Sequence, residues 1–224
     1  MLADIEQGSL ASKAATEIRN MLIEGHFGPG EKLSEVQVAS QLGISRNTLR
    51  EVFRILASQG LLIHVPNRGA FVAAPDEAAV IDIYRTRRVI QRGAVHAAAL
   101  GHPALARMQA LVADAGNMRD GGNWQAVGTL NMDFHRAMVE LCDSSRLSAC
   151  FDLVMAELRL VFGQLIDTGH LHEPYVELNA SLYKLLLEGR TAEALSLLDH
   201  YLVQSERSVL AALHRRRSDQ KAVT

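Results

Sequence analysis

The hydrophobic pattern divides the chain into two parts of different character. Up to about residue 75, short helical periods are followed by a run of apolar and β-branched residues around a turn. From there to the end, apolar positions recur every three or four residues through long segments, which predicts amphipathic helices. We therefore expect a small mixed domain followed by a larger helical one.

The first part is predicted to form three short helices and a β-hairpin. The helices are expected over residues 10–24, 35–42 and 46–59. The second and third are joined by a short turn that contains Gly43, which is the spacing of a helix-turn-helix motif. Apolar residues at 61–65 and 70–72 flank a turn at 66–69, as in a hairpin. A helix-turn-helix followed by a hairpin is a winged helix.

The second part is predicted to form about six helices joined by short loops. They are expected over residues 77–100, 103–118, 124–141, 147–167, 174–189 and 192–214. Pro174 is expected in the first turn of the fifth helix, where a proline is tolerated. The expected fold class is thus mostly α. A winged helix-turn-helix with a small β-hairpin occupies residues 1–75, and an all-α bundle occupies residues 76–224.

Composition excludes several classes of protein. No stretch approaches the roughly 18 uncharged apolar residues of a membrane-spanning helix. The first residues, MLADIEQGSL, include acidic side chains and no apolar run, which argues against a secretory signal. Cys142 and Cys150 lack metal-ligand spacing and are expected to be reduced, in a cytoplasmic protein. No phosphate-binding glycine loop, nucleophile elbow or pair of catalytic carboxylates is present, so we expect no enzyme.

The net charge of −2 at first argues against a DNA-binding protein. Residues 1–75 hold seven basic and seven acidic side chains, so even the predicted winged helix has no net positive charge. Four of the basic side chains lie on its third helix and hairpin: Arg46, Arg50, Arg54 and Arg68. This placement predicts a DNA binder whose non-specific affinity is modest.

The third helix carries side chains suited to reading DNA. Arginine can pair bidentately with guanine and asparagine with adenine, while hydroxyls near a helix N-terminus can reach phosphate. The side chains placed for these contacts, with the hairpin tip, are Ser45, Arg46, Asn47, Thr48, Arg50 and Arg68. The alternative is that these side chains simply form a solvated polar face. The combination of turn, helix and wing favours DNA binding over that alternative.

These residues resemble the GntR family of bacterial transcription regulators. The similar runs are IEGHFGPGEKLSE at 23–35, LGISRNTLRE at 42–51, GLL at 60–62 and NRGAFV at 67–72. The resemblance covers about residues 10–73. It implies DNA contacts by Arg46, Thr48 and Arg50, assisted by Asn47 and by the wing tip at Arg68 and Gly69. Some members have an arginine where this chain has Val36, so that contact is expected to be absent.

The second part is similar to the effector-binding domain of the FadR subfamily, often called FCD. The similar runs are IYRTR at 83–87, DFHR at 133–136 and LEG at 187–189. The resemblance spans about residues 76–214. It implies a homodimer on an inverted-repeat operator, with an effector cavity inside each bundle and, by family precedent, repression as its action.

Many members of that subfamily hold a divalent metal in the cavity through an aspartate and three histidines. His135 matches the first histidine, while the other positions hold Asn131, Asn179 and Tyr201. A neutral amide and a protonated phenol are poor ligands for such a cation. We therefore expect no cofactor, with His135 as a weak metal candidate. Two further histidines, His170 and His172, are expected in a solvated loop.

A polar effector site is the alternative that the residues favour. Its expected members are Arg87, Asn131, His135, Asn179 and Tyr201. The planar guanidinium of Arg87 could clamp a carboxylate, although a salt bridge within the bundle or across the dimer explains it equally well. A small carboxylate or a sugar acid is the first expectation for the effector. A fatty-acyl thioester and a metal-dependent sensor remain alternatives.

Overall fold

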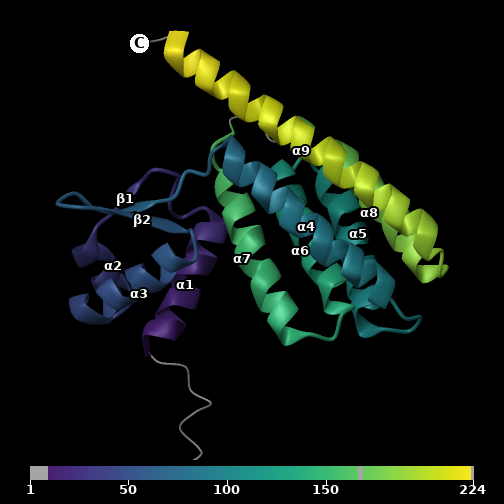
Figure 1. The fold of residues 1–224 in the computed structure, drawn as a ribbon, viewed down its shortest axis with the longest axis horizontal. Helices are drawn as coiled ribbons and strands as arrows, with labels where there is room; N and C mark the ends of the chain where they lie inside the picture. Colours follow the sequence, from purple (N-terminus) through teal and green to yellow (C-terminus); the bar gives the residue numbers. More distant parts are fainter. Residues whose placement is uncertain (1–9, 166–168, 223–224) are drawn as a thin grey trace, which may run out of the picture. The chain divides into compact units, whose positions relative to one another are not determined.

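The computed structural model describes residues 10–165 and 169–222. The chain forms two compact units. The first comprises Met1–Asp76 and Ala156–Gln164, and the second comprises Glu77–Met155 and Leu165–Thr224. Figure 1 shows the order of the elements along the chain.

The first unit contains the predicted helix-turn-helix. Its helices are α1 (Leu10–Glu24), α2 (Glu35–Gln41) and α3 (Arg46–Ser58). Ser34 begins α2, where its hydroxyl accepts a hydrogen bond from the amide of Gln37, and Ser45 does the same for α3 through the amide of Thr48. The turn between them includes Gly43 at φ 62°, a conformation that glycine adopts without strain.

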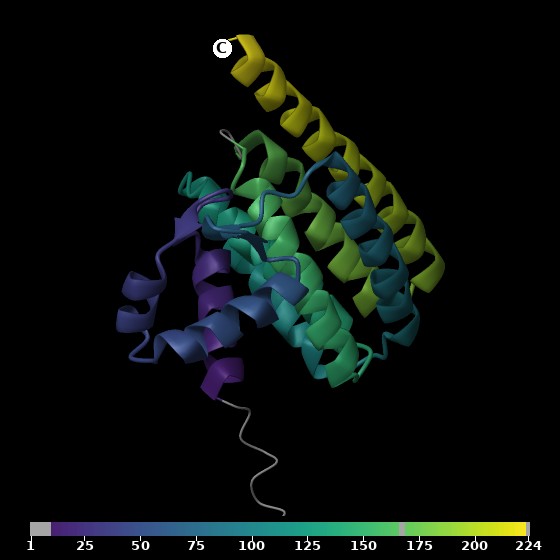
Figure 2. The same ribbon diagram turned by 60° about the vertical axis from the view of Figure 1, so that its left-hand side comes forward.

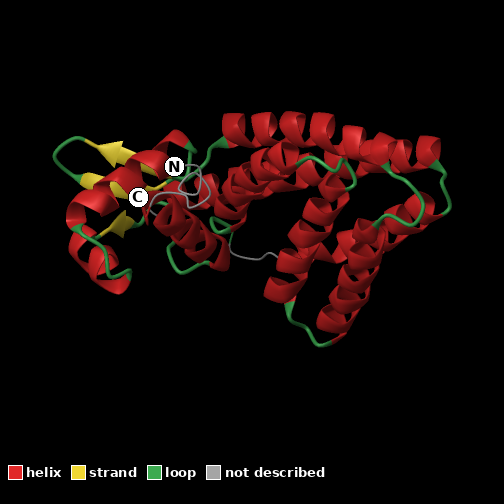
Figure 3. Ribbon diagram, turned by 90° about the horizontal axis from the view of Figure 1, so that it is seen from below, coloured by secondary structure: helices red, strands yellow, loops and turns green. Residues whose placement is uncertain are grey.

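The sheet of this unit has one strand more than the sequence predicts. Strands β1 (Lys32–Leu33), β2 (Leu62–Val65) and β3 (Gly69–Val72) form an antiparallel sheet in the order β1-β3-β2, shown in yellow in Figure 3. The hairpin of β2 and β3 is therefore confirmed. A two-residue strand such as β1 has no alternating pattern to detect, since it is defined only by its partner.

The apolar core of the first unit includes residues from far along the chain. Leu49, Val52 and Leu56 of α3 are fully buried against the other helices and the sheet. Ala156 and Leu160, from the last turns of α7 (Ser145–Phe162), belong to the same core cluster. The winged helix is therefore completed by a helix segment that lies about a hundred residues downstream in the sequence.

The second unit is the predicted helical bundle. With the first half of α7, its helices are α4 (Glu77–Ala97), α5 (Pro103–Asp120), α6 (Trp124–Glu140), α8 (Gly169–Leu187) and α9 (Thr191–Ala222). The long α9 lies along α4 and α8 (Figures 1 and 2). No helix within residues 10–165 and 169–222 is both long and apolar enough to cross a membrane.

Several details of the helical unit differ from the sequence prediction. Helix α7 ends at Phe162 and not at 167, and α9 continues to Ala222 and not only to 214. Helix α8 begins at Gly169, so Pro174 lies inside it and not in its first turn. His172 lies on α8 and is only 2% exposed, so the expectation of a solvated loop histidine was wrong. The side chain of His170 lies outside the described residues. A proline indicates the start of a helix only if it lies in the first helical turn. Here one more helical turn precedes Pro174, and the sequence does not reveal it.

We expect the Leu160→Ala substitution to weaken the winged-helix unit selectively. Removing this buried side chain should cost about 2–5 kcal/mol, because the cavity left in the core is only partly filled by relaxation. Hydrogen exchange should therefore be faster at the amides of α3. Leu147→Ala, in the first turn of the same helix and 38% exposed, is the matched control. Equal protection of α3 in both variants would contradict this assignment.

Candidate functional site

The first candidate site is the exposed face of α3 and the hairpin tip. Arg46, Asn47 and Arg50 are all exposed at the beginning of α3. Ser45 and Thr48 are also at this end, and their side-chain oxygens are 2.8 Å apart. Both hydroxyls therefore take part in capping the helix, and each retains hydrogen-bonding capacity toward a ligand.

A single carboxylate joins the two arginines of this face. The Oε2 atom of Glu35, on α2, lies 3.1 Å from Nε of Arg50 and 3.6 Å from an Nη of Arg46. Both arginines are more than half exposed, so each pair is weak in solution. Glu35 was not singled out from the sequence, because the spacing of 15 residues to Arg50 does not indicate a contact.

The hairpin tip presents the wing residues. Asn67 has a φ of 61°, which allows the tight turn, and the exposed Arg68 follows it. The guanidinium carbon of Arg68 lies 5.7 Å from the centre of the Phe71 ring, so the ring restricts where the arginine points. Gly69 adopts a φ of 103°, a conformation that L side chains rarely reach.

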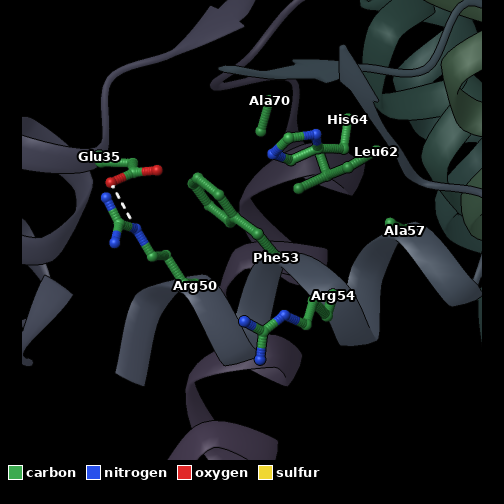
Figure 4. A pocket seen from close by; sticks show the side chains of 8 residues that line it. All are labelled: Glu35, Arg50, Phe53, Arg54, Ala57, Leu62, His64 and Ala70. Carbon is green, nitrogen blue, oxygen red and sulfur yellow. Dashed lines mark hydrogen bonds and ion pairs between the residues drawn. The ribbon is translucent and has the colours of Figure 1, made fainter. Parts of the chain in front are cut away.

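A groove separates α3 from the sheet within this unit. Its volume is about 340 Å³. It is lined by Glu35, Arg50, Phe53, Arg54, Ala57, Leu62, His64 and Ala70, all shown in Figure 4. The apolar members are buried or half-buried and form its floor, while Arg54 and His64 are exposed.

The second candidate site is a cluster of buried polar side chains in the helical unit. His135 on α6 is completely buried, and hydrogen bonds join it to α4 and α9. Its Nδ1 lies 2.6 Å from Nε2 of Gln91, and its Nε2 lies 2.8 Å from the hydroxyl of Tyr201. Asn131, one turn before His135, accepts hydrogen bonds from Tyr201 at 2.8 Å and from Asn179 at 2.7 Å.

The direction of these hydrogen bonds fixes the protonation of His135. Because the Tyr201 hydroxyl donates to Asn131, it accepts from Nε2–H of His135, and Nδ1 accepts from the amide of Gln91. This assignment describes a neutral imidazole. It agrees with the pKa of His135, which burial and then the nearby charge of Arg87 lower well below 6.5.

Arg87 brings a buried positive charge to this cluster. Its side chain is 2% exposed, and the guanidinium carbon lies 4.8 Å from the centre of the Tyr84 ring. Burial raises the pKa of Tyr84, which therefore stays neutral and does not compensate the charge. Within residues 10–165 and 169–222, Arg87 makes no ion pair with a carboxylate. The alternative of a salt bridge inside the bundle is thus not seen there.

Three buried atoms of the cluster have no hydrogen-bond partner in the described part of the chain. They are Nε of Arg87, Oε1 of Gln91 and Oδ1 of Asn179. The first is a cationic donor, and the other two are acceptors. Buried polar atoms are almost always paired with protein, water or a ligand. These unpaired atoms mark the cluster as a candidate site for a polar molecule.

The structure brings together all five residues expected from the sequence and adds others. Gln91 was missed, although it lies four residues after Arg87 and thus on the same helix face. His172 was dismissed as solvated. Its imidazole packs on α6, and a Cβ added at Gly128 would lie 2.7 Å from its Nε2. Gly128, inside an amphipathic helix, was the available signal for this close approach.

The donor set does not fit a tightly held divalent metal. Both ring nitrogens of His135 are occupied, one by the Gln91 donor and one by its own proton toward Tyr201. Burial raises the pKa of the Tyr201 hydroxyl, which disfavours the phenolate that a metal would require. Among the described residues, no group of three or more His, Cys, Asp or Glu side chains could hold a metal ion.

We expect the neutral His135 to make stability depend on pH. The unfolded chain binds a proton near pH 6.5, whereas the folded pKa is lower, so the free energy of unfolding falls as the pH drops below about 6.5. The slope from this one group approaches about 1.4 kcal/mol per pH unit. His135→Gln should remove it from a plot of unfolding free energy against pH. The exposed His200→Gln is the control, and equal slopes in both variants would refute the assignment.

Both parts of the chain match known families. Residues 10–72 match the family described as bacterial regulatory proteins, gntR family, and residues 82–204 match the FCD domain. The two matches follow one another in the order that the sequence resemblance implies. They cover the α3 face and the buried polar cluster, respectively.

Individual relatives agree with this assignment. A candidate GntR transcriptional regulator from Rhodococcus sp. RHA1 is 34% identical, with a TM-score of 0.82, over 92% of this chain and 99% of that one. The Nta operon transcriptional regulator of Aminobacter aminovorans is 36% identical over 35% of this chain. A candidate D-xylose utilization operon transcriptional repressor of Paenarthrobacter nicotinovorans is 25% identical over 73% of this chain and 77% of its own length.

The matches to several of the curated relatives span only about a third of those proteins' length. The two family models and the Rhodococcus structure together cover both units of the chain. The chain therefore belongs to the GntR family of bacterial transcription regulators, in the branch that carries an FCD domain.

Proposed function

We propose that the protein is a cytoplasmic repressor that binds an inverted-repeat operator as a homodimer. A small hydroxylated carboxylate or sugar acid is the proposed effector, bound at the buried polar cluster around Arg87. The observation that carries the effector assignment is the buried Arg87 without a carboxylate partner in the described chain.

The proposed DNA contacts are those expected from the sequence: Ser45, Arg46, Asn47, Thr48, Arg50, Arg68 and Gly69. All of them are exposed except Thr48 and Gly69, which are half-buried. This exposure supports the assignment, since a recognition helix presents its N-terminal side chains to the major groove. One winged helix offers few base-reading side chains. A dimer doubles the contacts and requires two symmetric half-sites, which explains the proposed inverted repeat.

The proposed effector matches the polar atoms that lack partners. A carboxylate would pair with the guanidinium of Arg87, and hydroxyl groups would donate to Oε1 of Gln91 and Oδ1 of Asn179. A fatty-acyl chain would leave both acceptors without a hydrogen bond. It would forgo about 0.5–1.5 kcal/mol for each hydrogen bond that it does not make, so the thioester is the weaker candidate.

A thermal-shift screen tests the effector class. Hydroxycarboxylates, sugar acids, acyl thioesters and a metal chelator form its four arms. Stabilisation by a hydroxylated acid, with no shift from the chelator, is the expected result. Destabilisation by the chelator would instead favour a metal-dependent sensor. The hit should change operator affinity by about 5- to 150-fold, and unchanged affinity would contradict the proposed regulation.

Arg46→Ala should relax the sequence preference of the protein. Losing a bidentate contact to guanine costs about 1–3 kcal/mol, and the cost falls on the correct base only. The measurement is selection of bound duplexes from a random pool with the wild type and the variant. Arg146→Ala, an exposed arginine on α7, is the control. If Arg46→Ala lowers the affinity for all DNA sequences equally, Arg46 does not read a base.

Arg87→Met should raise the stability of the ligand-free protein while abolishing its response to the effector. A methionine of similar volume removes a desolvated charge that has no carboxylate partner. The melting temperature should rise by about 2–4 °C for each kcal/mol gained. Arg88→Gln, at the next position and paired with Glu206, is the control. Loss of both stability and response would indicate a structural role for Arg87 instead.

A further inference from the structure

The groove between α3 and the sheet carries a positive charge that the predicted DNA contacts do not use. Of its two arginines, Arg50 is paired with Glu35 at 3.1 Å. Arg54, one turn further along the same face of α3, is exposed and makes no ion pair among the described residues. His64 faces the groove from β2, on the opposite wall (Figure 4). The groove thus presents donors from two separate elements.

The geometry of duplex DNA indicates what would occupy such a groove. One sugar-phosphate strand separates each major groove from the neighbouring minor groove. A protein that puts a helix in the first and a wing tip in the second must therefore straddle that strand. The groove lies between α3, which bears Arg46, and the strands that lead to Arg68. The groove is therefore where the sugar-phosphate strand between the major and the minor groove would lie.

We propose that this groove seats one DNA backbone strand and that Arg54 and His64 bind its phosphates. The proposal rests on the proposed reading of DNA by α3 and adds two contacts to it. Arg54 supplies a full charge, and the imidazole of His64 supplies a hydrogen-bond donor from the other side. The buried floor between these two donors includes Phe53 and Leu62.

Such contacts act without regard to base sequence. A phosphate bound by a cation releases condensed counterions, so each one steepens the fall of affinity with salt by about 0.9 in a log–log plot. Arg54 and His64 would therefore hold the register of the strand while Arg46 reads bases. Loss of a phosphate contact should change the salt dependence of binding, whereas loss of a base contact should change the sequence preference. The two kinds of contact can therefore be distinguished by experiment.

The test needs no knowledge of the operator. Binding of the full-length protein to a mixed-sequence duplex of about 20 base pairs is measured by fluorescence anisotropy between roughly 50 and 200 mM salt. Arg54→Gln should lower the magnitude of the salt slope by about 0.9 for each winged helix bound. His64→Ala should weaken binding about 2- to 10-fold, as expected for one lost hydrogen bond. Neither variant should alter the base preference of duplexes selected from a random pool.

Arg146→Gln on α7 is the matched control, because it removes the same charge from an exposed position in the helical unit. Unchanged thermal unfolding of Arg54→Gln excludes a folding defect. Suppose that the wild type binds DNA and that Arg46→Ala changes its base preference. If Arg54→Gln then keeps the wild-type salt slope, the groove does not bind the DNA backbone, and the proposed reading of DNA by α3 still stands. If the wild type binds no duplex at any salt concentration, both proposals fall.

Discussion

The rotational setting of α3 is the constraint on which the candidate DNA-reading face depends. Leu49, Val52 and Leu56 are completely buried and recur at helical spacing, so they fix which side of α3 faces the core. Arg46, Arg50 and Arg54 recur every four residues and are consequently turned to solvent. A rotation by a single residue, about 100°, would place charges in the core, which no rearrangement of the loops could offset.

This core is shared with α7, whose residues belong to both units. Its last turns supply Ala156 and Leu160 to the winged-helix core. Its first half holds Asp152, whose carboxylate lies 3.1 Å from Nε of Arg136. Arg136 follows His135 directly on α6, so this ion pair ties α6 to the first half of α7 within the helical unit.

The periodicity of the chain and its local signals predict much of the fold. The helices, their capping serines and the hairpin follow from spacing within a few residues, and all are present in the structure. The strand β1 and the burial of His172 could not be predicted, because each depends on a partner distant in sequence. The pairing of Glu35 with two arginines is of the same kind.

For the polar cluster, the sequence predicts most of the residues but not the hydrogen bonds between them. That Asn131, Asn179 and Tyr201 stand at the positions of metal ligands suggested a polar site in place of a metal. Only the structure reveals that Tyr201 and Asn179 both donate to Oδ1 of Asn131, and that Oδ1 of Asn179 and Oε1 of Gln91 are left without a partner in the described chain. The order of donors and acceptors, which decides what ligand fits, is a property of geometry that residue types alone do not determine.

The same geometry implies that folding and effector binding are linked energetically. The hydrogen bonds that run from Gln91 through His135 and Tyr201 to Asn131 are already formed, so a ligand need not break them. The guanidinium of Arg87, in contrast, loses its water when the unit folds and gains no carboxylate from the described chain. The cost of that desolvation reduces the stability of the free protein, and an anion would recover part of it. On the proposed assignment, affinity for an anion would therefore be obtained at the expense of stability without one.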